Sequence, residues 1–226
     1  MVMTDLYRRP ADLPPVIPVF PLRGAILLPR ATLPLNIFEP RYLAMVEAAM
    51  SGSRVIGLLQ PDGGSQEEES PSGKNCQLRP VGCVGRITTY QELEDGRYII
   101  TLTGVARFKV VNEVSSEAPF RVMKVSYDDF ANDFQAGFGE NEVDRDRLLH
   151  VLRNYLDANN LKADWNAILR ASSEVLINAL SVMSPYGPEE KQALLEAPDL
   201  KSRADVLIAL AEMELASGGA TGGTLQ

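Results

Sequence analysis

The spacing of apolar residues changes beyond the middle of the chain. Up to about residue 130, short apolar runs follow one another and several alternate with polar residues, which is typical of β-strands. From Glu142 onward, apolar residues recur every three or four positions, which predicts amphipathic helices. The pattern therefore predicts an α+β protein in which a β-rich part precedes a helical part.

Proline and glycine mark the expected strands. Eight of the 15 prolines lie in the first 40 residues, where the missing amide donor and fixed φ of proline favour short extended segments over long helices. Asp95-Gly96, flanked by alternating runs, predicts a hairpin turn. We expect strands at 16–20, 32–38, 54–60, 82–93, 97–103, 105–114 and 120–127, with one helix at 41–50. Six or seven strands are enough to close a small barrel or sandwich.

Composition predicts where the domains begin and end. We expect a β domain at 14–130, a helical bundle at 131–216, and flexible tails at 1–13 and 217–226. Residues 61–74 are rich in Pro, Gly, Ser and Glu and contain no apolar residue, which predicts a mobile loop within the β domain. Four helices are expected in the bundle: one from Asn141 or Asp144 to Asn159-Asn160, and three at 173–183, 188–197 and 199–216.

The charge is unevenly distributed. The chain has 22 basic and 30 acidic residues, a net charge of −8. Residues 131–226 account for −7 of this, with 8 basic and 15 acidic residues. This sign disfavours nucleic acid as the main partner, because phosphate backbones attract basic surfaces. With two cysteines, no secretory signal pattern and no apolar run near the roughly 18 residues of a membrane span, we expect a cytoplasmic protein without membrane contact.

The sequence offers little that is typical of catalysis or metal binding. Gly73-Lys74 is the only Gly-Lys pair and lies outside any strand–loop–helix context, which argues against a phosphate-binding loop. His150 is the sole histidine, and Cys76 and Cys83 lack the spacing of a metal or redox pair. We therefore expect no catalytic residue, no metal and no cofactor. A hydrolase with an unrecognised serine nucleophile stays open as an alternative.

Several spaced motifs resemble one protein family. The order of Pro-Leu-Arg, Leu-Pro, Leu-Pro-Leu and Phe-Glu-Pro-Arg-Tyr steps within residues 18–46 resembles the N-terminal domain of the ATP-dependent protease Lon. Residues 81–87, 103–108 and 190–196 are similar to further family motifs, in the same order. The resemblance extends over about residues 15–216.

This resemblance implies both a fold and a role. It implies a small PUA-like β barrel followed by a helical bundle, with a part in substrate recognition. The ATPase and serine–lysine peptidase domains that the protease should carry do not follow in these 226 residues. We therefore expect a stand-alone, non-catalytic form, not an enzyme.

Candidate binding residues come from the motifs and from the expected linker. In the motifs, Glu39 and Arg41 flank a strand-to-helix turn, and Arg107 on a strand suits a bidentate contact with a carboxylate. Phenylalanines in the linker either line an apolar groove or tie the linker to the barrel; we expect two of Phe130, Phe134 and Phe138 to do the latter. The predicted binding residues are Arg23, Glu39, Arg41, Tyr42, Arg107, Phe130 and Phe134, and a structural role is the competing interpretation for each.

Three functions are compatible with these features. The first is binding of unfolded proteins or peptide segments, with a separate protease or adaptor as a further partner. The second is an RNA-binding PUA-like module, for which the nearly neutral β domain leaves room. The third is an adaptor for a native protein partner. We expect any binding face on the barrel or at its junction with the bundle.

Overall fold

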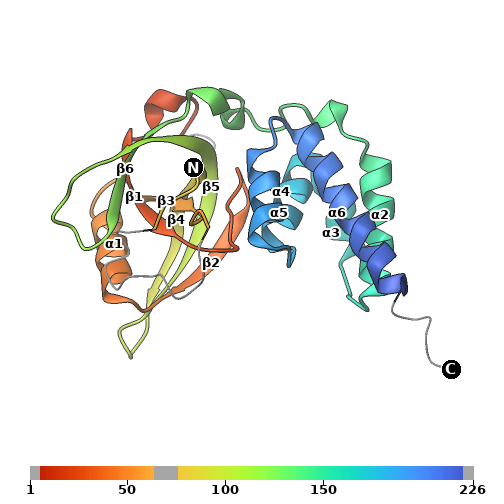
Figure 1. Ribbon diagram of the computed structural model, residues 1–226, viewed down its shortest axis with the longest axis horizontal. Coiled ribbons are helices and arrows are strands. Elements are labelled where there is room, and N and C mark those ends of the chain that lie inside the picture. The colour runs from red at the N-terminus through yellow and green to blue at the C-terminus, as the bar shows by residue number, and fades with distance from the viewer. Residues whose placement is uncertain (1–5, 64–75, 221–226) are drawn as a thin grey trace.

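In the computed structural model, which describes residues 6–63 and 76–220, a six-stranded sheet lies beside a group of helices (Figure 1). Helix α1 packs on the side of the sheet that faces away from the other helices. The strands are β1 (Val16–Pro21), β2 (Thr32–Ile37), β3 (Val55–Leu59), β4 (Val81–Glu92), β5 (Tyr98–Glu113) and β6 (Arg121–Ser126). The helices are α1 (Pro40–Met50), α2 (Arg145–Ala158), α3 (Trp165–Arg170), α4 (Ser173–Met183), α5 (Pro188–Glu196) and α6 (Leu200–Ala220), with 3-10 turns η2 (Pro10–Asp12), η4 (Asp128–Phe134) and η5 (Glu140–Glu142).

Strand β5 organises the sheet. The strand order is β2-β5-β4-β3-β1-β6, and β5 also pairs with β6. Its first half pairs with β2, where Ile37 lies opposite Tyr98, and its second half pairs with β6, where Lys109 lies opposite Ser126. Pairing is antiparallel except between β1 and β3. Five strands therefore follow one another in a ring of pairings, and β2 extends the sheet beyond it.

Two predicted strands, 97–103 and 105–114, are one strand in the structure. Gly104 lies between them and was expected to break the run. Instead the ladder continues with a register shift, and a Cβ at Gly104 would lie 2.0 Å from the Leu28 carbonyl oxygen. The missing side chain lets the Leu28–Ala31 backbone cross β5, with Arg30 N donating to Gly104 O at 2.8 Å.

The inner face of the ring is filled by one apolar cluster. Phe108 is fully buried there, together with Ile17, Val19, Val84 and Val125 from other strands. Gly57 and Gly82 make room for the Phe108 ring, because a Cβ at either position would lie 3.0 Å or less from its Cζ atom. Close packing around this ring leaves no space for an added methyl group.

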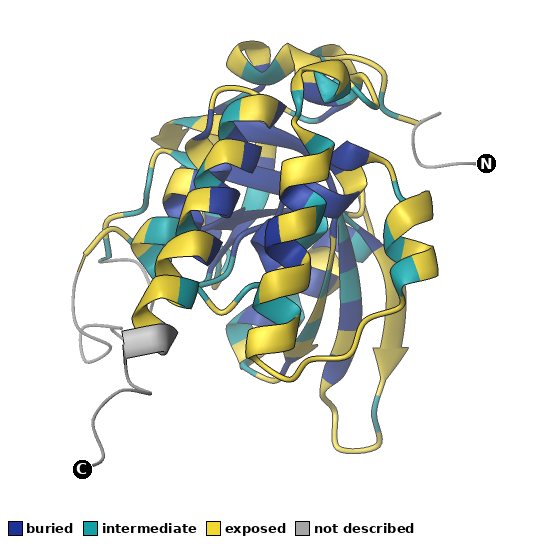
Figure 2. Ribbon diagram, turned by 90° about the vertical axis from the view of Figure 1, so that its right-hand side faces the viewer, coloured by how far each residue is buried: buried dark blue, intermediate teal, exposed yellow. Residues whose placement is uncertain are grey.

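A second cluster joins the sheet to the helices. Tyr42, Met45 and Val46 of α1 pack against buried side chains of the sheet, and the Phe20 and Tyr42 ring centroids are 4.3 Å apart. The same cluster runs through Leu27 to Leu194 of α5 and on to α2, α4 and α6. Figure 2 shows that the exposed positions of the helices lie on the side away from the sheet. The two parts of the chain therefore share one core.

The helices begin where side chains satisfy their first amides. Asp144, Asp164 and Ser172 accept hydrogen bonds from the first turns of α2, α3 and α4, and Pro188 occupies the first position of α5. Helix α3 was not predicted, because six residues are too few for a repeated apolar pattern beyond Trp165, Ile168 and Leu169. The helical part therefore has five α-helices, not four, among the described residues.

The predicted tails and loop fall largely outside the described residues, which exclude 1–5, 64–75 and 221–226. Where they are described, two segments differ from the prediction. Residues 6–13 form an ordered entry, since Asp12 accepts hydrogen bonds from Arg8 N and Arg9 N and Leu13 is buried. Residues 217–220 continue α6, which ends at Ala220.

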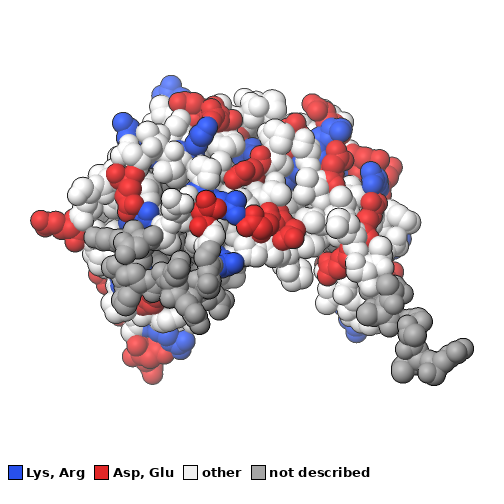
Figure 3. Space-filling view, viewed as in Figure 1, with Lys and Arg blue, Asp and Glu red and all other residues white. Residues whose placement is uncertain are grey.

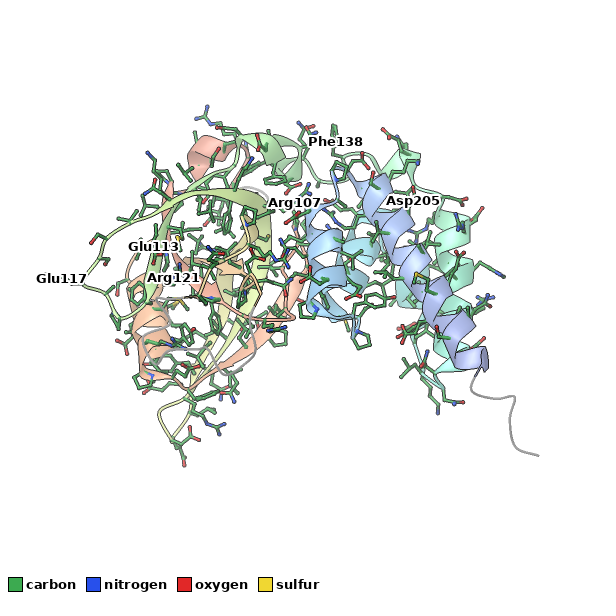
Figure 4. The ribbon with its side chains drawn as sticks, viewed as in Figure 1. Arg107, Glu113, Glu117, Arg121, Phe138 and Asp205 are labelled. Carbon is green, nitrogen blue, oxygen red and sulfur yellow. The ribbon has the colours of Figure 1, made fainter. Side chains whose placement is uncertain are left out.

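A buried ion pair holds the sheet to the linker and to α5. Arg107 of β5 and Asp133 of η4 have side chains only 5% and 8% exposed. Two parallel hydrogen bonds join them, from Nε to Oδ2 at 2.9 Å and from Nη2 to Oδ1 at 2.8 Å. Nη1 of Arg107 also donates to the Leu195 and Ala197 carbonyls at the end of α5. In Figure 4 Arg107 lies at the boundary between sheet and helices.

Further polar contacts cross the same boundary. Arg30 donates to the Asp133 carbonyl and pairs with the Glu174 carboxylate on α4. Asn178 of α4 donates to the Pro29 carbonyl at 3.0 Å and accepts from Nη1 of Arg203 at 2.9 Å. These hydrogen bonds between distant parts of the chain fix the position of the helices on the sheet.

Replacing Gly82 tests the packing of the ring. In Gly82→Ala, the new Cβ would lie 2.4 Å from the Leu58 carbonyl oxygen and 2.7 Å from Phe108 Cζ, so the sheet must shift. We expect the free energy of unfolding, measured by urea denaturation, to fall by about 1–3 kcal/mol. Gly52→Ala is the control, because its Cβ meets nothing closer than 3.6 Å. Equal stability of the two variants would contradict the packing described here.

Neutralising Asp133 tests the ion pair. Asp133→Asn leaves the buried Arg107 charge without its carboxylate, so we expect a loss of about 3–5 kcal/mol in the free energy of unfolding. The control is Asp129→Asn, whose exposed carboxylate lies 3.8 Å from Lys109 and should change stability by less than about 1 kcal/mol. A double variant, Arg107→Met with Asp133→Leu, should recover part of the loss, because no unpaired charge stays buried. No recovery, or a small loss in Asp133→Asn, would show that the pair does not hold the junction.

Candidate functional site

An apolar groove lies in the helical part, between α2, α6 and the end of α4. We call it the α2–α6 groove. Its volume is about 240 Å³, and no charged side chain lines it. Its lining includes Leu148, Val151 and Leu152 from α2, Leu180 and Met183 from α4, and Leu207 and Ile208 from α6. The groove therefore offers burial to an apolar group from solution.

The apolar side of α2 is wider than its neighbours cover. Apolar residues at 148, 151, 152, 155 and 156 form a stripe with helical spacing. Helix α3 packs elsewhere on α2: Arg153 lies over the Trp165 ring at 4.5 Å, and Arg145 donates to carbonyls at the end of α3. Part of the stripe is therefore left facing the groove.

A buried lysine fixes the end of α4, which forms one wall. Lys191 of α5 is 3% exposed and donates from Nζ to the carbonyls of Ser181 and Val182. Burial lowers the pKa of Lys191. Its ammonium replaces the hydrogen bonds that the last helical carbonyls lack, so the turn that carries Met183 is held in place.

The rim of the groove is exposed. The Met183 side chain is 78% exposed and that of Leu161 is 53% exposed, although both line the groove. Large apolar side chains gathered at an open groove mark an interaction surface, whereas single exposed ones elsewhere, such as Phe38, are ordinary.

Two tyrosines, Tyr155 and Tyr186, line the groove. Burial raises the pKa of Tyr186 to about 12, and the charges of Tyr155 and Glu214 act in the same direction. Burial also raises the pKa of Tyr155. The charge of Glu214 and a hydrogen bond with its carboxylate add to this effect. Both hydroxyls are therefore neutral hydrogen-bond donors at neutral pH.

The predicted residues at the linker occupy structural positions at the junction. Arg107 is buried against Asp133, and its guanidinium lies 4.5 Å from the centroid of the Phe130 ring. Phe134 packs against the apolar cluster inside the ring of strands. Phe138, in contrast, is 48% exposed and lies at the top of the connection in Figure 4.

The other predicted residues lie at the sheet. Arg41 pairs with Glu39 at 2.8 Å and stacks on Tyr42, whose ring is buried against Phe20. Arg23 is exposed in the loop after β1. The structure thus brings Glu39, Arg41 and Tyr42 together, and Arg107 with Phe130, but none of the predicted residues lines the α2–α6 groove.

Sequence reasoning missed the groove because its residues read as helix core. One signal was available: α2 has apolar residues on more positions per turn than a single neighbour covers, and Met183 precedes a Ser-Pro break. A wide apolar stripe next to an exposed apolar helix end predicts a surface that is not fully packed.

The described residues hold neither a metal-ligand cluster nor a membrane-spanning helix. Within residues 6–63 and 76–220, no three His, Cys, Asp or Glu side chains gather as a metal ion would require. None of the helices in that part of the chain is long and apolar enough to span a bilayer.

Comparison with known proteins identifies the fold. A crystal structure of a Lon N-terminal domain protein from Xanthomonas campestris matches 86% of this chain and 97% of its own, with 21% identity and a TM-score of 0.60. The N-terminal domain of the Mycobacterium avium complex Lon protease matches 87% of this chain and 98% of its own, with 17% identity and a TM-score of 0.63. These likenesses show an α+β fold shared with Lon N-terminal domains.

Sequence comparison gives the family. Lon protease 2 of Myxococcus xanthus is 28% identical over 202 residues, which are 88% of this chain and 24% of that protein. The Lon protease of Flavobacterium johnsoniae is 26% identical over 200 residues, 85% of this chain and 23% of its own. The chain thus spans about a quarter of the length of these relatives. The family model of the ATP-dependent protease La (LON) substrate-binding domain matches residues 16–212, so the chain belongs to this family of substrate-binding domains.

Proposed function

We propose that this chain binds unfolded or extended segments of protein substrates in the α2–α6 groove and takes no part in catalysis itself. The observation that carries the proposal is an open, uncharged apolar groove with Met183 and Leu161 exposed on its rim, in a chain of the substrate-binding domain family. A native protein buries its large apolar side chains, whereas an unfolded segment presents them.

The size and chemistry of the groove suit such segments. Its volume of about 240 Å³ exceeds the roughly 150 Å³ of an engineered apolar cavity that holds benzene, so more than one side chain has room to enter. The unbranched Met183 adapts to different shapes. Each apolar side chain contributes at most about 1.5–3 kcal/mol, less the cost of ordering the segment, so we expect weak and tolerant binding.

The sheet serves as the scaffold in this proposal. We interpret it as a small PUA-like barrel, which the ring of five paired strands supports. The relatives are Lon proteases about four times as long, so we propose a protease, separate or covalently joined, as the partner that receives the bound segment. We also propose a reducing, cytoplasmic location, which the low cysteine content of the chain favours.

Two double variants test the groove. Leu161→Gln with Met183→Gln removes two rim contacts, so we expect the Kd for an apolar peptide to rise about tenfold or more. The probe is a fluorescein-labelled peptide of about twelve residues, a length that one extended segment provides, in which Leu and Phe alternate with Ser and Gly. Fluorescence anisotropy measures the Kd.

The matched control is Leu169→Gln with Met213→Gln. Leu169 and Met213 are 57% and 66% exposed and lie outside the groove lining. Both double variants should keep the free energy of unfolding within about 1 kcal/mol of the original chain, because all four side chains are exposed. If the two variants bind the peptide equally, or the original chain does not bind it, the proposed function is wrong.

A further inference from the structure

One carboxylate continues the α6 side of the groove. Leu207 and Ala211 line the groove, and Glu214 follows Ala211 by three residues, which places it on the same face one turn further along. Tyr155 and Tyr186 also line the groove, and the charge of Glu214 raises the pKa of both hydroxyls. Glu214 therefore lies beside the groove and near these two tyrosines.

The carboxylate of Glu214 forms no ion pair with another described residue. None of the ion pairs among the described residues includes it, whereas Glu212, two residues earlier, pairs with Arg147 at 3.1 Å. Two cations of the helical part do not pair with this carboxylate among the described residues. Arg153 lies over the Trp165 ring, and no ion pair joins Glu214 to Lys162.

The surroundings add to this charge. Residues 131–226 carry a net charge of −7, and acidic side chains are spread over the helices in Figure 3. A cation that approaches Glu214 meets an attractive potential, and a second anion meets a repulsive one.

Resting on the proposed function, we propose that the α2–α6 groove selects apolar segments that carry a lysine or arginine beside the apolar side chains, and that Glu214 with Tyr155 and Tyr186 binds this cation. The carboxylate of Glu214 can accept a charge-assisted hydrogen bond from the lysine or arginine. The rings of Tyr155 and Tyr186 attract an ammonium or guanidinium group. Apolar burial then supplies most of the affinity, and the charge decides between segments.

Three peptides of one apolar core test this selectivity on the full chain. The core is the Leu/Phe-Ser/Gly sequence used above, flanked on each side by Lys, by Gln or by Glu. We expect the Kd to rise in the order Lys, Gln, Glu, with about threefold to tenfold between the first and the last at low ionic strength. The difference should shrink in about 1 M salt, where the Debye length is about 3 Å.

Matched charge variants assign the effect. Glu214→Gln should abolish the order of the three peptides, because it removes the exposed carboxylate and keeps a side chain of similar size. Glu212→Gln changes the net charge equally on the same helix and should keep the order.

The outcomes separate this inference from the proposed function. Binding of the Gln-flanked peptide without any order, or an order that persists in Glu214→Gln, overturns the cation site and leaves the groove intact. An equal loss of order in both variants shows a general field effect and also overturns it. Failure of all three peptides to bind overturns the proposed function as well.

Discussion

Burying a guanidinium is costly unless its charge is paired and its donors are bonded, and at Arg107 these bonds join three parts of the chain. Its backbone belongs to β5, its carboxylate partner Asp133 to the linker, and its remaining acceptors to the end of α5. Desolvation of two charges costs several kcal/mol, which the paired geometry offsets only when all the acceptors are in place. The positions of the sheet, the linker and α5 are therefore mutually dependent.

This constraint extends to the groove through α5. The end of α5 is fixed by Arg107, while Lys191 on the same helix holds the carbonyls that end α4. The position of Met183 on the groove rim therefore depends on the sheet, through the contacts of Arg107 with α5 and of Lys191 with α4. Arg203, buried nearby, has its pKa lowered to about 10 by burial and by the charge of Arg107, which shows how crowded with cations the junction is. The negative charges of Asp133 and Glu174 act on the pKa of Arg203 in the opposite direction and raise it.

Much of the fold was predictable because it depends on local patterns. Period-two runs and Asp95-Gly96 predicted the β4–β5 hairpin, and Asp144, the cap of α2, was one of the two predicted starts of that helix, with Asn141. What could not be predicted depends on contacts between distant residues. Gly104 suggests the end of a strand unless the Leu28 backbone that crosses it is known. Asp133, the partner of Arg107, lies 26 residues away in the sequence. The groove was missed for the same reason, since an apolar residue such as Val151 reads as core until its neighbours are placed.

The strand order also sets when the sheet can form. Strand β1 near the start of the chain pairs with β6, and Val19 lies opposite Arg121. The ring of strands is therefore incomplete during synthesis until β6 has left the ribosome, and β1 has one unpaired edge until then. Contacts of such high sequence separation slow folding and expose strand edges to other chains. The protein thus passes, while being made, through a state in which the apolar strand β1 presents one unpaired edge.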